Sequence, residues 1–164
     1  MGRYILSLGS NVGSRLFSIL SACRMLGEAG RVEEVSRVYL TEPVGPPQGW
    51  FLNVCLLLET GLDPWGLLEL CKGIEAAIGR IPRGRWGPRE IDVDIVWFSG
   101  GRVEGRSLVV PHPRWRERLF VVAGILDLGF RRLDGVDVSG LSLRLSRQRV
   151  IPLPVASAYL KGAL

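Results

Sequence analysis

The sequence predicts an α+β fold built on one antiparallel sheet, and two observations lead to this expectation. Apolar runs of strand length alternate with two longer segments in which apolar residues recur at helical spacing. The runs follow one another as strand, helix, strand, strand, helix, strand, and stretches rich in glycine and proline separate several of them. A chain of 164 residues with 47% hydrophobic residues can form a proper core, so one domain spanning residues 1–164 is expected.

The chain opens with a strand that leads through a tight turn into a helix. Residues 3–8, RYILSL, are the strand candidate. Residues 9–14, GSNVGS, form the turn, and Asn11 or Ser14 is available to cap the helix expected over residues 15–26.

Two further strands and a second helix follow. The second strand is expected over residues 31–42 and the third over residues 51–60. Between them, residues 43–49 contain three prolines and two glycines, which excludes regular structure. The second helix begins with Asp63 as its cap and Pro64 at the first helical position, an order typical of helix starts.

A loop rich in arginine precedes the fourth strand. Residues 80–89, RIPRGRWGPR, contain four arginines and lead into a strand over residues 90–98. The resulting order is that of the ferredoxin-like βαββαβ fold, which predicts an antiparallel sheet with both helices on one face. A third helix is expected over residues 114–128, with short strands and turns after it.

Arginine dominates the basic residues of this chain. The formal net charge is +5, and Lys72 and Lys161 are the only lysines among 21 basic residues. Arginine grips phosphate through a planar, two-pronged group. The excess therefore favours an anionic partner, whether nucleotide, nucleic acid or membrane surface. A bias in genomic composition would produce the same excess.

Other classes of protein are disfavoured. No apolar run reaches the roughly 18 residues of a membrane helix, and residues 1–11 lack the layout of a secretion signal, so a cytoplasmic location is expected. Cys23, Cys55 and Cys71 are odd in number and widely spaced. This pattern favours buried thiols over a disulfide framework or a zinc site.

Two aspartates interrupt the otherwise apolar fourth strand. Because side chains alternate across a strand, Asp92 and Asp94 are expected on one face, and Ile95 and Trp97 on the face that packs against the helices. Their Cα atoms are expected about 6.5 Å apart, and two carboxylates at that range repel by about 2–3 kcal/mol at an effective dielectric of about 20. Solvent, nearby arginines or a divalent cation can offset this cost. The adjacent arginine loop favours magnesium and phosphoryl-transfer chemistry.

The segment RWGPREIDVDIV, residues 85–96, resembles the signature of the 6-hydroxymethyl-7,8-dihydropterin pyrophosphokinases, enzymes of folate synthesis. It contains a basic residue, then Gly-Pro-Arg, then Asp-aliphatic-Asp and two aliphatic residues. Other segments resemble this family in the same order along the chain, namely YILSLGSNVGSR, TEPVGPPQGWFLN, IEAAIGR and VPHPRWRERLF. The resemblance covers residues 3–128.

The resemblance implies a reaction and a cofactor. Enzymes of this family move a pyrophosphoryl group from ATP to the hydroxymethyl group of the pterin and release AMP. Two magnesium ions, held by Asp92 and Asp94, would relieve the repulsion between these carboxylates. The implied catalytic residues are Arg80, Arg89, Asp92 and Asp94. The expected partners are small molecules, ATP and hydroxymethyl-dihydropterin, with neither nucleic acid nor membrane, and the chain is expected to be a monomer.

The resemblance also assigns residues to the nucleotide. These ATP-binding residues are Lys72, Arg80, Arg83, Arg89, Ile95, His112 and Arg118. Three features depart from some relatives: Lys72 replaces a glutamine, Pro113 replaces a tyrosine, and the arginine loop is one residue shorter. None of these departures removes a metal ligand or a central arginine, so activity is expected.

The pterin requires a flat slot with a hydrogen-bonding rim. The implied pterin-binding residues are Thr41, Val44, Phe51, Asn53, Trp86 and Phe120. Phe120 would stack on the ring, Asn53 would use its amide on the ring edge, and Trp86 would close over the site. Both loops beside the site, residues 43–49 and 80–87, have few apolar anchors and are expected to be mobile.

Two rival interpretations fit the sequence less well. A ferredoxin-like RNA-binding module would need stacking aromatics on its central strands, but the fourth strand carries Asp92 and Asp94 at those positions. A catalytically degenerate nucleotide-binding protein would have lost part of the signature, whereas Arg89 and both aspartates are present.

Overall fold

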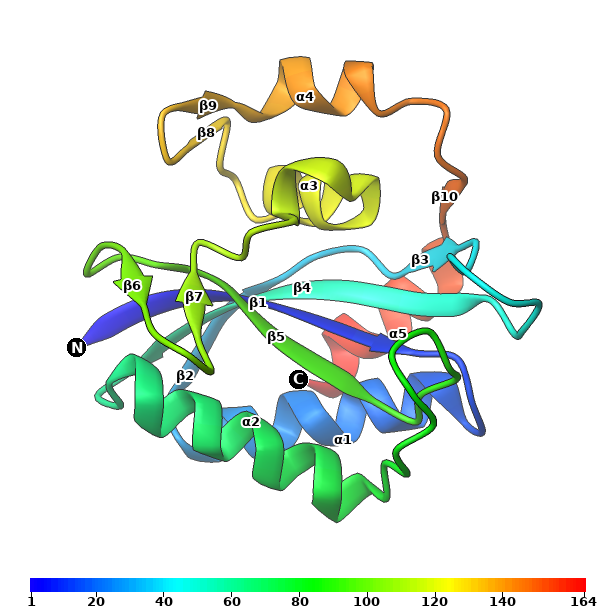
Figure 1. Cartoon of the computed structure of the whole chain (residues 1–164), viewed down its shortest axis with the longest axis horizontal. Helices are drawn as coiled ribbons and strands as arrows, with labels where there is room; N and C mark the ends of the chain where they lie inside the picture. The colour runs from blue at the N-terminus through cyan, green and yellow to red at the C-terminus, as the bar shows by residue number, and fades with distance from the viewer.

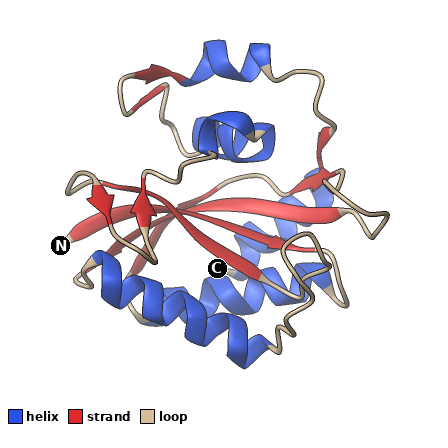
Figure 2. Cartoon of the chain, viewed as in Figure 1, coloured by secondary structure: helices blue, strands red, loops and turns tan.

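The computed structural model of the chain describes residues 1–164, and its centre is a six-stranded sheet in which every pairing is antiparallel (Figure 1, Figure 2). The strand order is β10-β3-β4-β1-β5, and β2 also pairs with β4. The strands are β1 (Gly2–Ser10), β2 (Arg31–Val35), β3 (Tyr39–Thr41), β4 (Phe51–Thr60), β5 (Asp92–Phe98) and β10 (Val150–Pro152). The predicted α+β class and ferredoxin-like core are confirmed.

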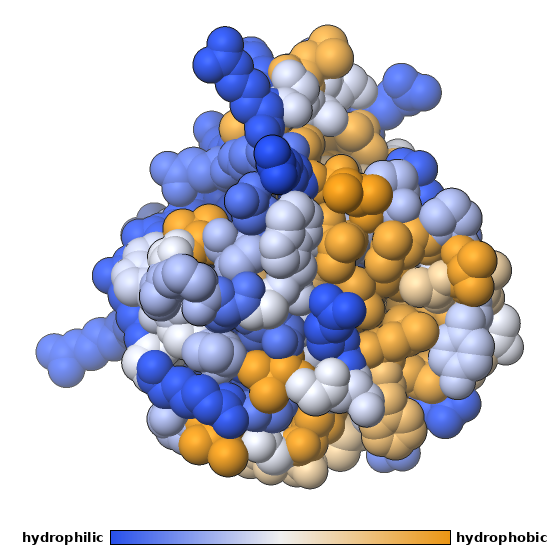
Figure 3. Space-filling model, turned by 90° about the vertical axis from the view of Figure 1, so that its right-hand side faces the viewer, coloured by the Kyte–Doolittle hydropathy of each residue, from blue (hydrophilic) through white to orange (hydrophobic).

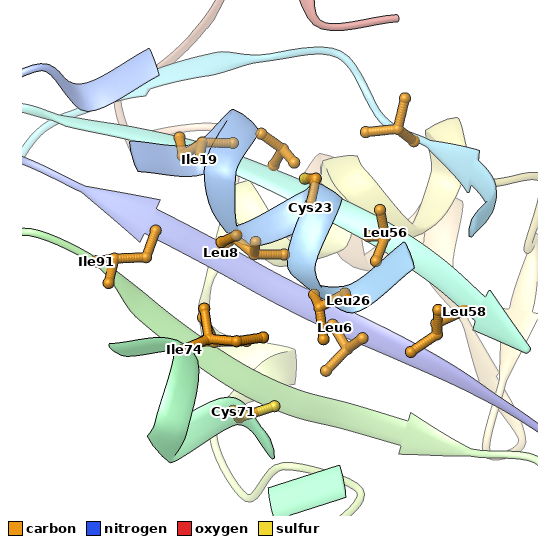
Figure 4. Close-up of a cluster of buried hydrophobic side chains, with 14 of the residues drawn as sticks. Leu6, Leu8, Ile19, Cys23, Leu26, Leu56, Leu58, Cys71, Ile74 and Ile91 are labelled. Atoms are coloured by element: carbon orange, nitrogen blue, oxygen red, sulfur yellow. The ribbon is translucent and has the colours of Figure 1, made fainter. Parts of the chain in front are cut away.

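Two helices, α1 (Arg15–Glu28) and α2 (Pro64–Ile78), cover one face of the sheet, as the sequence predicted (Figure 1). The core on this side is formed by alternate strand residues such as Leu6, Leu8, Leu56 and Leu58, together with helix residues such as Ile19 and Ile74 (Figure 4). The predicted start of α2 is confirmed, because Asp63 Oδ1 accepts the N–H of Gly66 at 2.7 Å. This fully packed face holds the strands rigidly beneath the opposite face.

The opposite face of the sheet is covered at one end only. There, α3 (Leu119–Asp127) and α4 (Val138–Arg144) pack on Ile5, Leu57 and Val96 in a second core (Figure 1). Further along the same strands this face carries small or polar residues, which line a cavity instead of a core. They are Ser7, Gly9, Asn53, Asp92 and Asp94.

Two predicted elements prove to be interrupted. The predicted strand 31–42 divides into β2 and β3, because Ser36 between them pairs with Cys55 of β4 in an irregular way: Ser36 Oγ accepts the N–H of Cys55 at 2.8 Å. The predicted helix 114–128 is a 3-10 turn at Trp115–Glu117 followed by α3. Arg118, with φ −114° and ψ 105°, is extended and separates the two.

The predicted alternation along β5 holds from Asp92 through Val96 and fails at Trp97 and Phe98. A bulge shifts the pairing, so that Leu6 faces Ile95 but Ile5 faces Trp97. As a result Phe98 lies in the core beneath α1 and α2, stacked on Tyr4 with ring centroids 4.5 Å apart. Trp97 lies on the other face, against Phe130. The prediction that Trp97 shares a face with Ile95 was therefore wrong.

The segment after residue 128 contains helices that the sequence pattern did not predict. Two short hairpins lie outside the main sheet. β6 (Val103–Glu104) pairs with β7 (Val109–Val110) before α3, and β8 (Arg132–Leu133) pairs with β9 (Val136–Asp137) after it. The expected short strands are present after residue 128 as β8, β9 and β10, but the helices α4 and α5 (Pro154–Ala163) were not expected. α5 packs beside α1 and buries Leu160 in the main core.

The C-terminal segment also leaves apolar side chains at the surface. Ile151, Val155 and Tyr159 are all exposed. Figure 3 shows a broad apolar area on the side of the molecule where β10 and α5 lie, next to a hydrophilic half.

None of the helices has both the length and the apolar character that a membrane span requires. Cys23, Cys55 and Cys71 are buried free thiols.

Candidate active site

The open end of the sheet holds the two aspartates of the fourth predicted strand. Asp94 lies opposite Ser7 of β1, and Asp92 lies opposite Gly9. Both carboxylates line a cavity of about 540 Å³ and a second cavity of about 410 Å³. The aspartates therefore stand where the two cavities meet.

Two arginines neutralise Asp92. Arg80 Nη1 lies 3.1 Å from Asp92 Oδ1, and Arg89 Nη1 lies 3.0 Å from Asp92 Oδ2. Both guanidinium groups are mostly buried, and they come from opposite ends of the arginine loop. The predicted catalytic arginines and aspartates are thus brought together in one cluster.

Glu75 of α2 is a member of this cluster that the sequence reasoning missed. Its carboxylate is buried, and Oε2 lies 2.7 Å from Arg80 Nη1 and accepts the N–H of Val93 at 2.9 Å. Burial raises the pKa of Glu75, while the bond from Val93 and the charge of Arg80 oppose that shift. A signal was present in the sequence, because an acidic residue on the apolar face of a helix requires a partner.

Asp94 has no such direct arginine partner. Burial, and then the charge of Asp92, raise the pKa of Asp94, and Arg118 opposes the shift. A cation beside the pair would relieve both causes. The protein contains no group of three or more side chains able to hold a metal by themselves. Two carboxylates do fit magnesium, which keeps several water or phosphate oxygens as ligands.

The smaller cavity corresponds to the predicted nucleotide side. Of the predicted ATP-binding residues, Lys72, Arg80, Ile95 and His112 line it. It is also lined by Arg106 and Ser107, which precede β7 and which the sequence reasoning missed. No motif marked Arg106 among the chain's many arginines.

His112 lies at the border of both cavities as a neutral imidazole. The ring Nδ1 accepts the backbone N–H of Arg114 at 3.0 Å, and the backbone N–H of His112 donates to the carbonyl of Val96 at 2.8 Å. Burial, and then the charge of Arg118, lower the pKa of His112 to about 4. The proton of the neutral ring therefore sits on Nε2, which is a donor.

The larger cavity contains all the predicted pterin-binding residues. They are Thr41, Val44, Phe51, Asn53, Trp86 and Phe120. Asn53 is buried, and its Nδ2 donates to Thr41 Oγ1 at 2.5 Å. A Cβ at Gly9 would overlap Asn53 Oδ1, so the glycine gives this amide its space. Trp86 is 45% exposed, with the Arg85 guanidinium 5.1 Å from its ring.

Three of the predicted ATP-binding residues do not line the smaller cavity. Arg89 and Arg118 line the larger cavity instead. Arg83 lines neither: its Nη1 pairs with Glu90 Oε2 at 2.7 Å, in a separate hollow behind the arginine loop. Of the predicted site residues, Arg83 alone is turned away from the carboxylates by an ion pair of its own.

Comparison with known proteins points to one family. The family model described as 7,8-dihydro-6-hydroxymethylpterin-pyrophosphokinase (HPPK) matches residues 5–129. The 2-amino-4-hydroxy-6-hydroxymethyldihydropteridine pyrophosphokinase of Bacillus subtilis is 43% identical over 126 residues, which cover 75% of each chain. The protein of the same name from Methylorubrum extorquens is 41% identical over 131 residues, 78% of this chain and 83% of the relative.

Solved structures share the fold. A crystal structure of wild-type Plasmodium falciparum HPPK-DHPS with SDX-DHP aligns with a TM-score of 0.69 and 14% identity. The alignment covers 87% of this chain and 44% of that one. The chain therefore spans less than half of that two-part protein, and at this identity the likeness shows the fold alone.

Proposed function

The chain belongs to the 7,8-dihydro-6-hydroxymethylpterin-pyrophosphokinase family, and from that premise we propose that the open end of its sheet is where the family's reaction takes place. The chain is an ATP-dependent diphosphotransferase of folate biosynthesis. It transfers the pyrophosphoryl group of ATP to the hydroxymethyl group of the dihydropterin. The observation that supports the location is the meeting of two cavities at Asp92 and Asp94.

Each cavity receives one substrate. The pterin ring lies in the larger cavity, where Phe51 and Phe120 offer ring faces and Asn53 offers an amide to its polar edge. ATP lies in the smaller cavity, with its triphosphate directed toward Arg80 and the aspartates. Attack of the hydroxymethyl oxygen on the β-phosphorus forms one P–O bond, breaks the bond to AMP and releases the hydroxyl proton.

Arg80 and Arg89 change partners when ATP enters. In the absence of nucleotide they neutralise Asp92. With the triphosphate present, these guanidinium groups are free to bind phosphate oxygens and stabilise the charge that develops there. His112 keeps Nε2–H as a neutral donor toward the same region, because the N–H of Arg114 occupies its Nδ1.

Asp92 and Asp94 would hold magnesium, two ions by the family resemblance. When bound, magnesium shields the triphosphate and makes the attacking hydroxyl more acidic. The contribution of the chain is to keep two carboxylates on one rigid strand, with the N–H of the intervening Val93 fixed by Glu75. We further propose that the enzyme acts as a monomer, which sedimentation at assay concentration tests.

AMP release from ATP, measured with magnesium and with or without the pterin, tests this site. The wild type releases AMP only with the pterin. Asp92→Asn and Asp94→Asn each lower the rate by more than the roughly 10–100-fold typical of losing an outer partner of a metal ligand. Asp134→Asn, which alters an exposed ion pair, is the matched control and keeps the rate. Near-normal rates in both site variants would remove these residues from the reaction.

A further inference from the structure

Gln148, in the segment between α4 and β10, holds the backbone on both sides of Arg118. Its side-chain Oε1 accepts the N–H of Leu119 at 2.9 Å, and its Nε2 donates to the carbonyl of Glu117 at 2.7 Å. Only one orientation of the amide satisfies both bonds, because its oxygen accepts and its nitrogen donates. Arg118 lies between the two peptide groups that Gln148 contacts.

These bonds supply a cap that α3 lacks in its own first turn. Arg118 occupies the cap position, and its side chain makes no capping bond, since a guanidinium group has donors but no acceptor. The first N–H groups of a helix have no partner within it, so an acceptor has to come from another residue or from water. Gln148 provides that acceptor from a position 29 residues after Leu119.

The neighbours of Gln148 hold it beside the larger cavity. The carbonyl of Arg149 accepts the N–H of Glu42 at 3.3 Å. Val150 then pairs with Thr41 as β10 joins the sheet. Because Thr41 and Glu42 both line the larger cavity, Gln148 is carried by a segment that is bound to the wall of that cavity.

The backbone at Arg118 sets the direction of two side chains of the larger cavity. Arg118 is extended, and Phe120 follows two residues later in the first turn of α3. Both side chains line the larger cavity, and neither lines the smaller one. Freedom in the backbone angles of Arg118 would therefore move the guanidinium group and the phenyl ring relative to a bound substrate.

We propose that Gln148 is a positioning residue for pterin binding, an inference that rests on the proposed function. Its amide fixes the extended backbone at Arg118 and so directs Phe120 toward the pterin ring. Gln148 lines neither cavity, so it acts only through these neighbours. It also lies beyond residues 5–129, the part of the chain that the family model matches. The C-terminal segment thus contributes to substrate binding without contacting the substrate.

Calorimetric titration of the pterin into enzyme saturated with magnesium and a non-hydrolysable ATP analogue tests this role. Gln148→Ala should raise the dissociation constant of the pterin by about 2–12-fold, the range that one aromatic contact contributes. The dissociation constant of the ATP analogue should stay at its wild-type value, because neither Arg118 nor Phe120 lines the smaller cavity. Gln148 is exposed, so the variant should fold.

Asp63→Ala is the matched control for a purely structural effect. Asp63 caps α2 through its bond to the N–H of Gly66. Both variants lose a helix cap, so both should lower the melting temperature by about 2–4 °C. Asp63 lines neither cavity, so its variant should bind the pterin as the wild type does. Equal losses of pterin affinity in the two variants, or wild-type affinity in Gln148→Ala, would overturn the inference.

Phe120→Ala provides a second test. Because Gln148 acts through Phe120, Gln148→Ala should weaken pterin binding less in a chain that already carries Phe120→Ala than in the wild type. An undiminished effect in the double variant would also overturn the inference. A wild type that releases no AMP in the presence of the pterin would instead reject the proposed function, and with it this role of Gln148.

Discussion

Gly9 shows how one residue sets the geometry of the site. It is buried in the central strand, opposite Asn53 on one side and Asp92 on the other, so it separates the proposed pterin and metal groups. An added Cβ would overlap Asn53 Oδ1 and approach Phe51. The absence of a side chain at this position therefore leaves the space that the Asn53 amide occupies.

Gly9→Ala should selectively weaken pterin binding. Displacing an amide that pairs with a buried polar edge costs about 1–3 kcal/mol, or about 5–150-fold in affinity. Steady-state kinetics should show a raised KM for the pterin with little change in the KM for ATP. Gly73→Ala, on an exposed turn of α2 with free space around the new methyl group, is the control and should bind both substrates normally. Equal changes in both KM values would argue against a specific role for Gly9.

His112 should titrate well below the ordinary range of histidine. It is the only histidine in the chain, so one NMR titration reports it without ambiguity. Burial lowers its pKa to about 4, whereas an unfolded histidine titrates near 6.5. Between these values the unfolded chain takes up a proton that the folded chain refuses, so the free energy of unfolding falls as the pH falls. In His112→Asn this contribution should disappear. A midpoint near 6.5 would contradict the buried, neutral ring.

The sequence was sufficient to predict many of the site residues, but not the hydrogen bonds and ion pairs between them. Asp92, Asp94 and Arg89 were predictable because charge inside an apolar strand requires an explanation and the motif supplied one. Glu75 was missed although an acidic residue on the apolar face of a helix was a signal. The bond from the N–H of Arg89 to Asn11 Oδ1 could not be foreseen, because the two residues lie 78 positions apart in the sequence. Arg83 was assigned to phosphate, yet its nearest partner is Glu90.

The link between α2 and β5 operates at the scale of elements. Glu75 ties the helix to the strand through the N–H of Val93 and to the arginine loop through Arg80. The position of the carboxylate pair therefore depends on how α2 packs.

Glu75→Ala should lower the free energy of unfolding by about 1–3 kcal/mol, because it leaves a buried N–H without a partner. Glu75→Gln keeps an acceptor for Val93 and should recover most of this loss. Denaturant unfolding measures both, and Glu69→Ala on the exposed side of α2 is the control. Equal losses in the Ala and Gln variants would mean that the ion pair, and not the bond to the strand, stabilises this contact.

The C-terminal helix is the element for which sequence reasoning failed. The first four strands and two helices have strong periodicity and clear stops, such as Asp63 and Pro64 at the start of α2. α5 is short, and only Leu160 and Ser157 are buried in it, so its pattern is weak. Its helical state depends on packing against α1.

Leu160→Ala should destabilise the protein by about 2–5 kcal/mol, as expected for truncating a fully buried leucine. The KM values should remain unchanged, because α5 does not line either cavity. Val155→Ala, at a position that is 84% exposed in the same helix, should change stability by no more than about 0.5 kcal/mol. A small effect at Leu160 would show that α5 is not part of the main core.

At the scale of the whole molecule, the site exists because the second layer is incomplete. α1 and α2 cover one face of the sheet fully, whereas α3 and α4 cover only one end of the other face (Figure 1). The uncovered end keeps its polar side chains and is enclosed by loops. Sequence periodicity identified the sheet and its first layer, but it could not show where the second layer ends, since that depends on contacts between distant elements.

The most direct test is a crystal structure with magnesium, a non-hydrolysable ATP analogue and the hydroxymethyl-dihydropterin. Magnesium should lie about 2.0–2.1 Å from oxygens of Asp92 and Asp94, with the pterin in the larger cavity and Arg80 and Arg89 turned from Asp92 to phosphate oxygens. Metal ions bound elsewhere, or an Asp92 still paired with both arginines while the triphosphate lies outside the smaller cavity, would contradict the assignment.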